Sequence, residues 1–188
     1  MLIECKGIRK GKYFIPPFVL NEREIVILHL FGGTHFYDLS IFLAGVFSGQ
    51  TINENVTVNQ PLKFVEHFVE PSFRRLFFPI TIGEYIKRKS GNERAIAEKV
   101  FTLGYLNNKT HVNTLNGDRR KILSLYTTLS VSKNIVLDLV GLDPSGAKKT
   151  YSIVKENVKN GGSAILLENF EDFKDDCTKF VQIEIVDQ

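Results

Sequence analysis

The sequence is poor in cysteine and has no apolar stretch long enough to cross a bilayer. Its 188 residues include two cysteines. These are Cys5 and Cys177, at opposite ends of the chain and without the spacing of a zinc site or redox motif. We therefore predict reduced thiols in a cytosolic chain. No apolar run approaches the roughly 18 to 20 residues of a membrane-spanning helix, and no secretory signal precedes the first strand-like segment. We expect no direct membrane insertion.

An excess of charge of one sign is also missing. Lysine and arginine number 24 against 21 acidic residues, which gives a net charge of +3, and the two signs are interspersed. This balance argues against nucleic-acid binding. The four histidines show no metal-ligand spacing, so we assign no metal site. No repeat or flexible linker divides the chain, and we predict a single domain over residues 1–188.

Strands and helices alternate along the chain. The run EIVILHLF, residues 24–31, is almost continuously apolar, as in a strand buried on both faces of a sheet. A helix follows, for which we predict Asp38 as the N-cap and Gly49 as the stop. The middle of the chain reads as helical, with a capping box from Thr81 to Glu84. Further helices are predicted over 92–106, 117–130 and 145–162, and further strands over 134–140, 163–169 and 178–186.

The segment LFGGTHFYDLS, residues 30–40, lies between a strand and a helix, which is the setting of a phosphate-binding P-loop. The lysine of such a loop is missing. The order of the surrounding segments resembles the nucleotide-binding domain of ABC transporters, beginning with FVLNEREIVILHLFGG at the entry to the loop. In this register Gly32 matches the first glycine, Asp38 the lysine and Leu39 the magnesium-binding hydroxyl residue.

The resemblance extends to the other landmarks of that family. Glu70 stands at the Q-loop glutamine, Asp138 at the Walker B aspartate, Leu139 at the catalytic glutamate and Asn169 at the switch histidine. The resulting degenerate nucleotide-site positions are Gly32, Gly33, Asp38, Leu39, Ser40, Glu70, Asp138, Leu139 and Asn169. VNTLNGDRRKILSLYTTL resembles the signature stretch and GLDP the D-loop, and the matching residues are Leu115, Asn116, Gly117, Asp118, Arg119, Gly141, Leu142 and Asp143.

The resemblance implies an α/β fold with a P-loop NTPase core of the ABC type. This fold has a mainly parallel sheet, a small N-terminal antiparallel β part and a helical subdomain, inserted here at about residues 64–114. It also implies two partners, a second ABC-type subunit and a membrane permease. The permease would dock near Glu70, at Arg74, Arg75, Phe73, Phe77 and Phe78, although we expect these phenylalanines to belong to the core. The chain would be cytoplasmic, held at the inner face of the membrane only through a partner.

The substitutions argue against ATP chemistry. Asp38 replaces a cation by an anion. At about 4 Å and an effective dielectric constant near 20, this reverses an interaction of about 4 kcal/mol with one phosphate charge. His35 and Tyr37 place bulky side chains on a loop that must approach phosphate closely. Leu139 cannot act as a general base.

We predict from these substitutions a non-hydrolysing pseudo-ATPase that acts as an interaction or regulatory subunit and needs no cofactor. Two alternatives stay open. One is a weak ATP-binding ABC ATPase subunit, completed by a competent heterodimer partner, which would bind ATP and magnesium. The other is a small-molecule binder that uses the remodelled loop, with His35 and Tyr37 as polar contacts.

Overall fold

The computed structural model describes the backbone of residues 1–186 and their side chains except that of Arg74. The chain divides into two compact units. The first unit comprises Met1–Phe64, Asn134–Val140 and Val154–Gln188, and the second comprises Val65–Lys133 and Gly141–Ile153.

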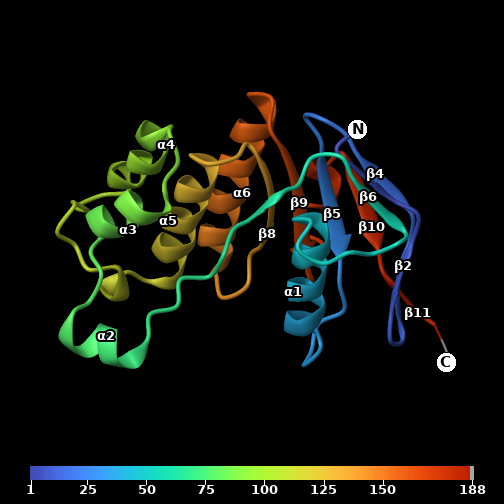
Figure 1. The fold of residues 1–188 in the computed structure, drawn as a ribbon, viewed down its shortest axis with the longest axis horizontal. Helices are drawn as coiled ribbons and strands as arrows, with labels where there is room; N and C mark the ends of the chain where they lie inside the picture. The colour runs from blue at the N-terminus through green and yellow to red at the C-terminus, as the bar shows by residue number, and fades with distance from the viewer. Residues whose placement is uncertain (187–188) are drawn as a thin grey trace. The chain divides into compact units, whose positions relative to one another are not determined.

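A five-stranded sheet forms the centre of the first unit (Figure 1). The strand order is β10-β5-β9-β8-β7, and all neighbouring strands are parallel. The central strands are buried along nearly their whole length, as their continuous apolar sequences predict. The strands are β5 (Ile25–His29), β7 (Lys63–Phe64), β8 (Asn134–Asp138), β9 (Ser163–Glu168) and β10 (Lys179–Gln182).

Two small antiparallel sheets complete the β-structure of the described part of this unit. One has the order β4-β1-β6 and the other β11-β3-β2. Their strands are β1 (Ile3–Cys5), β2 (Ile8–Lys10), β3 (Tyr13–Ile15), β4 (Phe18–Leu20), β6 (Val56–Val58) and β11 (Glu184–Ile185).

Helix α1 (Phe36–Phe47) follows β5 and packs its apolar face into the core of the first unit. Leu39, Leu43, Val46 and Phe47 recur at helical spacing and are all buried. Together with residues of β1, β4, β5, β8 and β9 they form one contiguous core. The last residues of α6 (Pro144–Lys159) and the short helix η3 (Lys174–Asp176) also belong to this unit.

The second unit is helical. Helices α3, α4 and α5 pack together, whereas α2 stands apart from them (Figure 1). Their shared core contains Ile82, Ile86, Val100 and Leu123. The elements are α2 (Ser72–Phe77), α3 (Ile82–Lys89), α4 (Arg94–Glu98), η1 (Lys99–Thr102), η2 (Val112–Thr114), α5 (Gly117–Leu129) and the first part of α6.

Local sequence signals predicted the start of helix α3 correctly. The capping box of α3 is confirmed, because Thr81 Oγ1 accepts from the backbone N–H of Glu84 and the Glu84 carboxylate accepts from that of Thr81. Other boundaries differ. The helix predicted over 92–106 is reduced to α4 and η1, and the strand predicted over 178–186 is divided into β10 and β11. Within residues 1–186, no helix combines the length and the apolarity that crossing a membrane requires.

Candidate functional site

Six residues, 30–35, connect β5 to the start of helix α1. Helix α1 already begins at Phe36, and His35 is its N-cap residue, with φ of −88°. The Phe36 N–H donates to the Gly33 carbonyl, and the Leu39 N–H donates to the His35 carbonyl. Gly33 supplies the only left-handed backbone of the turn, with φ of 112°. The positions matched to the lysine and to the magnesium-binding hydroxyl residue, Asp38 and Leu39, therefore lie in the first turn of the helix.

The prediction that Asp38 is the N-cap of α1 is wrong. Asp38 lies in the first turn, three residues after the N-cap His35, and is exposed. Within the described residues its side chain makes no hydrogen bond, and the His35 side chain makes no capping hydrogen bond either. The N-cap lies three residues earlier than predicted because a helix can begin at any residue whose backbone adopts N-cap angles. Residues 35–37, although bulky, adopt helical or near-helical angles without strain. Asp38 thus acts on α1 only through its charge.

The next two side chains of α1 are buried. Leu39 is only 4% exposed and belongs to the core of the first unit. Ser40 is buried as well, and its hydroxyl donates to the Phe36 carbonyl at 2.8 Å. Neither side chain presents an oxygen to the turn, where a magnesium ion would need one.

Replacing Asp38 tests its charge effect. Asp38→Ala is expected to destabilise the chain by about 0.3 to 1 kcal/mol, because an acidic side chain in the first turn complements the helix dipole. Asp38→Lys is expected to be worse than alanine, because it places a cation at the positive end of the helix. Urea denaturation of both variants measures this, with Asp172→Ala as a control at an exposed acid outside any helix. Equal midpoints for all four proteins would mean that the dipole of α1 does not depend on Asp38.

The end of β8 carries two residues of the predicted site. Asp138 is buried, and its Oδ1 accepts from the N–H of Val140 at 3.0 Å, so it stabilises the turn after the strand. Leu139 is 6% exposed, and its N–H donates to Oε1 of Glu168 at 2.8 Å. Asp138 therefore bonds within its own turn, and Leu139 is fixed by a carboxylate from β9.

Sequence reasoning missed Glu168. This residue ends β9 and is 4% exposed. Its backbone carbonyl accepts from the N–H of Leu30, which leads into the turn after β5. A charged residue that ends a wholly apolar run at the carboxyl edge of a parallel sheet is the signal that would have found it.

The first unit also brings Gly32 close to Asn169. A Cβ atom added at Gly32 would lie 3.1 Å from Nδ2 of Asn169. The glycine turn and the residue at the switch position are therefore neighbours, but the side chain of Asn169 is an amide and cannot transfer a proton as histidine does.

The second unit joins the signature-like loop, residues 115–119, to the D-loop-like loop, residues 141–143. Asp118 Oδ1 accepts from the N–H of Asp143 at 3.3 Å. A Cβ added at Gly117 would lie only 2.9 Å from the carbonyl oxygen of Gly141. Leu115 is buried in the helical core, and Leu142 is partly exposed.

Both loops end at helix N-termini. Asn116 is the N-cap of α5, and its Oδ1 accepts from the N–H of Arg119 at 3.1 Å. Asp143 precedes α6, and its Oδ1 accepts from the N–H of Gly146 at 2.8 Å. These two side chains satisfy backbone groups that a helix leaves without partners at its first turn.

The two carboxylates of these loops affect each other. Burial, with the neighbouring carboxylate of Asp143, raises the pKa of Asp118. The N–H of Gly146 in the first place, with the side chain of Asp118, lowers the pKa of Asp143. As the pH falls, Asp118 is therefore protonated before Asp143.

The remaining site prediction, Glu70, lies in the second unit beside an apolar surface. Oε1 of Glu70 accepts from the N–H of Ile80 at 2.7 Å, which closes the loop that carries α2. The expectation that Phe73, Phe77 and Phe78 are core residues is wrong, because all three are exposed. Helix α2 has only six residues and too few neighbours to cover them. We call the exposed group the α2 patch, and its residues are Val69, Phe73, Leu76, Phe77 and Phe78.

Comparisons with known proteins identify the fold. No protein-family model matches the sequence, and no curated protein sequence matches it. A nucleotide-free ATP-binding cassette from an ABC transporter superimposes with a TM-score of 0.68 and 15% identity, over 96% of this chain and 87% of that one. The subunit cbiO1 from Clostridium perfringens, part of the ABC transporter complex cbiONQ, gives a TM-score of 0.66 and 15% identity, over 97% and 84%.

A dimeric bacterial ABC transporter cassette is also similar, with a TM-score of 0.65 and 13% identity over the whole of both chains. At these identities the likeness shows the fold. The predicted fold class is confirmed: the chain has the α/β fold of ATP-binding cassettes, with a five-stranded parallel sheet and smaller antiparallel sheets.

The group that this fold implies is ATP with a magnesium ion, and the residues of the first unit do not fit it. Phosphate would meet the carboxylate of Asp38 where a cation is needed, and magnesium would meet the buried Leu39 instead of a hydroxyl. Among the described residues, no group of three or more His, Cys, Asp or Glu side chains is arranged to hold a metal ion.

Proposed function

We propose that this chain is a non-hydrolysing pseudo-ATPase with the cassette fold, acting as an interaction or regulatory subunit beside a second ABC-type subunit and a membrane permease. The observation that carries the proposal is that buried leucines occupy two positions that hydrolysis depends on. Leu39 and Leu139 stand where hydrolysis needs a hydroxyl and a carboxylate, and both are buried. Buried aliphatic side chains neither hold magnesium nor position water.

The loss extends beyond single side chains. Phosphoryl transfer depends on a cation and on backbone N–H groups that surround the phosphates. Here the exposed carboxylate of Asp38 follows the turn of residues 32–35. Restoring a lysine at one position would therefore still leave the buried Leu39 and Leu139 at the positions where a hydroxyl and a carboxylate are needed.

The α2 patch supports docking of an apolar partner. Phe73 and Phe77 lie one turn apart on α2, with ring centroids separated by 4.9 Å. Contiguous exposed apolar side chains of this kind mark binding surfaces. Aromatic residues contribute most to the binding energy of such surfaces. We assign the α2 patch to the permease, because cbiO1, which shares the fold, is part of a transporter complex.

The second proposed surface is formed by the signature-like and D-loop-like loops, which would face the second ABC-type subunit. Leu142→Arg is expected to weaken association with that subunit about tenfold, because it places a charge in a contact that must exclude water. Leu142 is partly exposed, so the midpoint of unfolding should change little. Association at full strength in the Leu142→Arg variant would show that a different surface is used.

Affinity capture from the native cell tests the proposed function. The wild-type chain is expected to co-purify with an intact cassette subunit and a membrane permease, identified by mass spectrometry. Leu142→Arg should lose the cassette subunit and keep the permease, because the two partners use separate surfaces. Capture of neither partner by the wild-type chain would contradict the proposal.

A further inference from the structure

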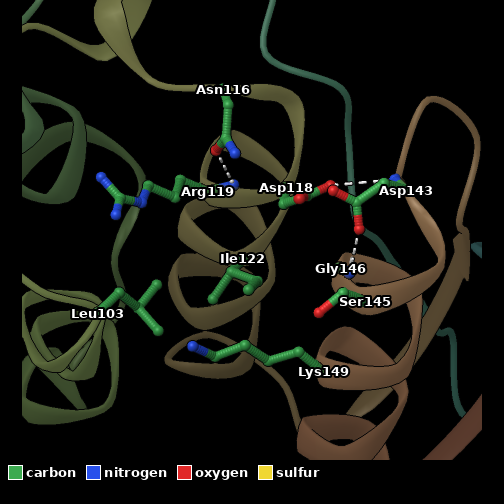
Figure 2. A pocket seen from close by; sticks show the side chains of 9 residues that line it. All are labelled: Leu103, Asn116, Asp118, Arg119, Ile122, Asp143, Ser145, Gly146 and Lys149. Atoms are coloured by element: carbon green, nitrogen blue, oxygen red, sulfur yellow. Dashed lines mark hydrogen bonds between the residues drawn. The ribbon is translucent and has the colours of Figure 1, made fainter.

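The second unit contains a pocket of about 170 Å³ between the first turns of α5 and α6 (Figure 2). Its floor is apolar and consists of Leu103 and Ile122, while its walls are polar or charged. The pocket is lined by Leu103, Asn116, Asp118, Arg119, Ile122, Asp143, Ser145, Gly146 and Lys149.

One side of the pocket is acidic and held in place. The carboxylates of Asp118 and Asp143 lie together at the start of α6 (Figure 2). Gly146 leaves room for them, since a Cβ atom there would overlap the carboxyl group of Asp118. Each carboxylate also accepts one backbone N–H, from Asp143 and Gly146 respectively. The acidic side is thus ordered before any ligand arrives.

The other side of the pocket is basic. Arg119 comes from α5 and Lys149 from α6, and both extend toward Leu103, away from the carboxylates (Figure 2). Among the residues that the structure describes, neither forms an ion pair. The four charges of the pocket therefore stand in two groups of opposite sign that do not neutralise each other by direct contact.

We propose that this pocket binds a small zwitterion, with the ligand's ammonium group at Asp118 and Asp143 and its carboxylate at Arg119 and Lys149. A simple anion would meet the two carboxylates, and a simple cation would meet the arginine and the lysine. A ligand with both charges satisfies both sides. A cavity of about 150 Å³ accommodates a six-carbon ring, so the volume fits an amino acid of about six to nine non-hydrogen atoms, its aliphatic part against Leu103 and Ile122.

The inference goes beyond the proposed function and does not rest on it. The pocket lies within one unit, and its ligand needs no nucleotide. It shares Asp118, Arg119 and Asp143 with the loops proposed to face the second ABC-type subunit, so bound ligand and subunit would compete for this surface. The test therefore uses the full chain alone, so that failure of the pocket and failure of the subunit interactions are read in separate experiments.

Isothermal titration of the full chain with four probes tests the proposal. L-alanine and γ-aminobutyrate carry both charges at different separations, while n-butylamine and butyrate carry one charge each. At least one zwitterion is expected to bind saturably with a dissociation constant below roughly 20 mM, which is weak binding, as expected for so small a ligand. Neither single-charge probe should bind as tightly. Absence of saturable zwitterion binding overturns the proposal, as does equal binding of butyrate or n-butylamine.

Two variants locate the binding. Asp118→Asn keeps an acceptor for the N–H of Asp143, and Lys149→Gln changes an exposed helix position, so both should fold. Each is expected to weaken zwitterion binding about fivefold, as for the loss of one solvent-accessible ion pair. Lys148→Gln, at the neighbouring exposed lysine, should bind like the wild type. Unchanged binding in both pocket variants would place the ligand elsewhere and overturn the proposal.

Discussion

Phe73→Glu is expected to weaken capture of the membrane permease by about thirtyfold. A central aromatic residue of an interface contributes about 2 kcal/mol or more, and 1.4 kcal/mol corresponds to a factor of ten in affinity. The substitution also places a charge beside Phe77, its ring neighbour in the α2 patch. Because Phe73 is 70% exposed, the free energy of unfolding should change by less than about 0.5 kcal/mol.

A matched control comes from the first unit. Phe170 is 64% exposed, so Phe170→Glu changes the surface charge equally at a similar exposed phenylalanine outside the α2 patch. Co-purification of the permease from native cells, compared across wild type and the two variants, measures the effect. If Phe170→Glu reduced capture as much as Phe73→Glu, the loss would reflect charge in general and the assignment of the α2 patch would be wrong.

Gly117→Ala is expected to destabilise the chain by a net of up to about 2.5 kcal/mol. The new Cβ would lie 2.9 Å from the carbonyl oxygen of Gly141, a backbone atom that cannot rotate away, and overpacking of this kind costs about 1 to 3 kcal/mol. The better helix propensity of alanine offsets part of this, by about 0.5 to 1 kcal/mol. The midpoint in urea measures the result.

Lys148→Ala serves as the control for this variant, because it changes an exposed position of α6 and should leave the midpoint nearly unchanged. The Gly117→Ala variant should also bind the second ABC-type subunit less well, since it separates the two loops proposed to meet it. A midpoint equal to or above that of the wild type would show that these loops do not approach each other as described.

Continuous apolar sequences made the fold predictable. The runs that became β5, β8 and β9 are typical of strands buried on both faces, which favoured a sheet covered by helices. Capping chemistry placed the start of α3 equally well, because Thr81 and Glu84 satisfy each other locally. Both of these signals depend only on neighbouring residues, and both agree with the structure.

Contacts between distant segments were not predictable. The approach of Asp118 to Asp143 joins residues 25 apart, and no local pattern indicates that one would accept a hydrogen bond from the other. The same holds for Glu168 and Leu139, which meet because β9 and β8 are neighbouring strands. The pocket in the second unit was missed for this reason.

Among the predictions that were wrong, two failed for different physical reasons. The N-cap of α1 was placed at Asp38 from residue preference, but the backbone of His35 begins the helix without side-chain help. Phe73 was expected in the core because large aromatic residues usually are. A six-residue helix held on a loop offers too little surface to bury it.

Titration of the purified chain with magnesium and ATP tests the central claim most directly, namely that the turn of residues 32–35 with Asp38 no longer holds phosphate. Thermal unfolding followed up to millimolar nucleotide should show no saturable stabilisation, because ligand binding raises stability in proportion to the logarithm of ligand concentration over the dissociation constant. A flat response is expected. A saturable rise in the unfolding temperature that ADP competes away would contradict it.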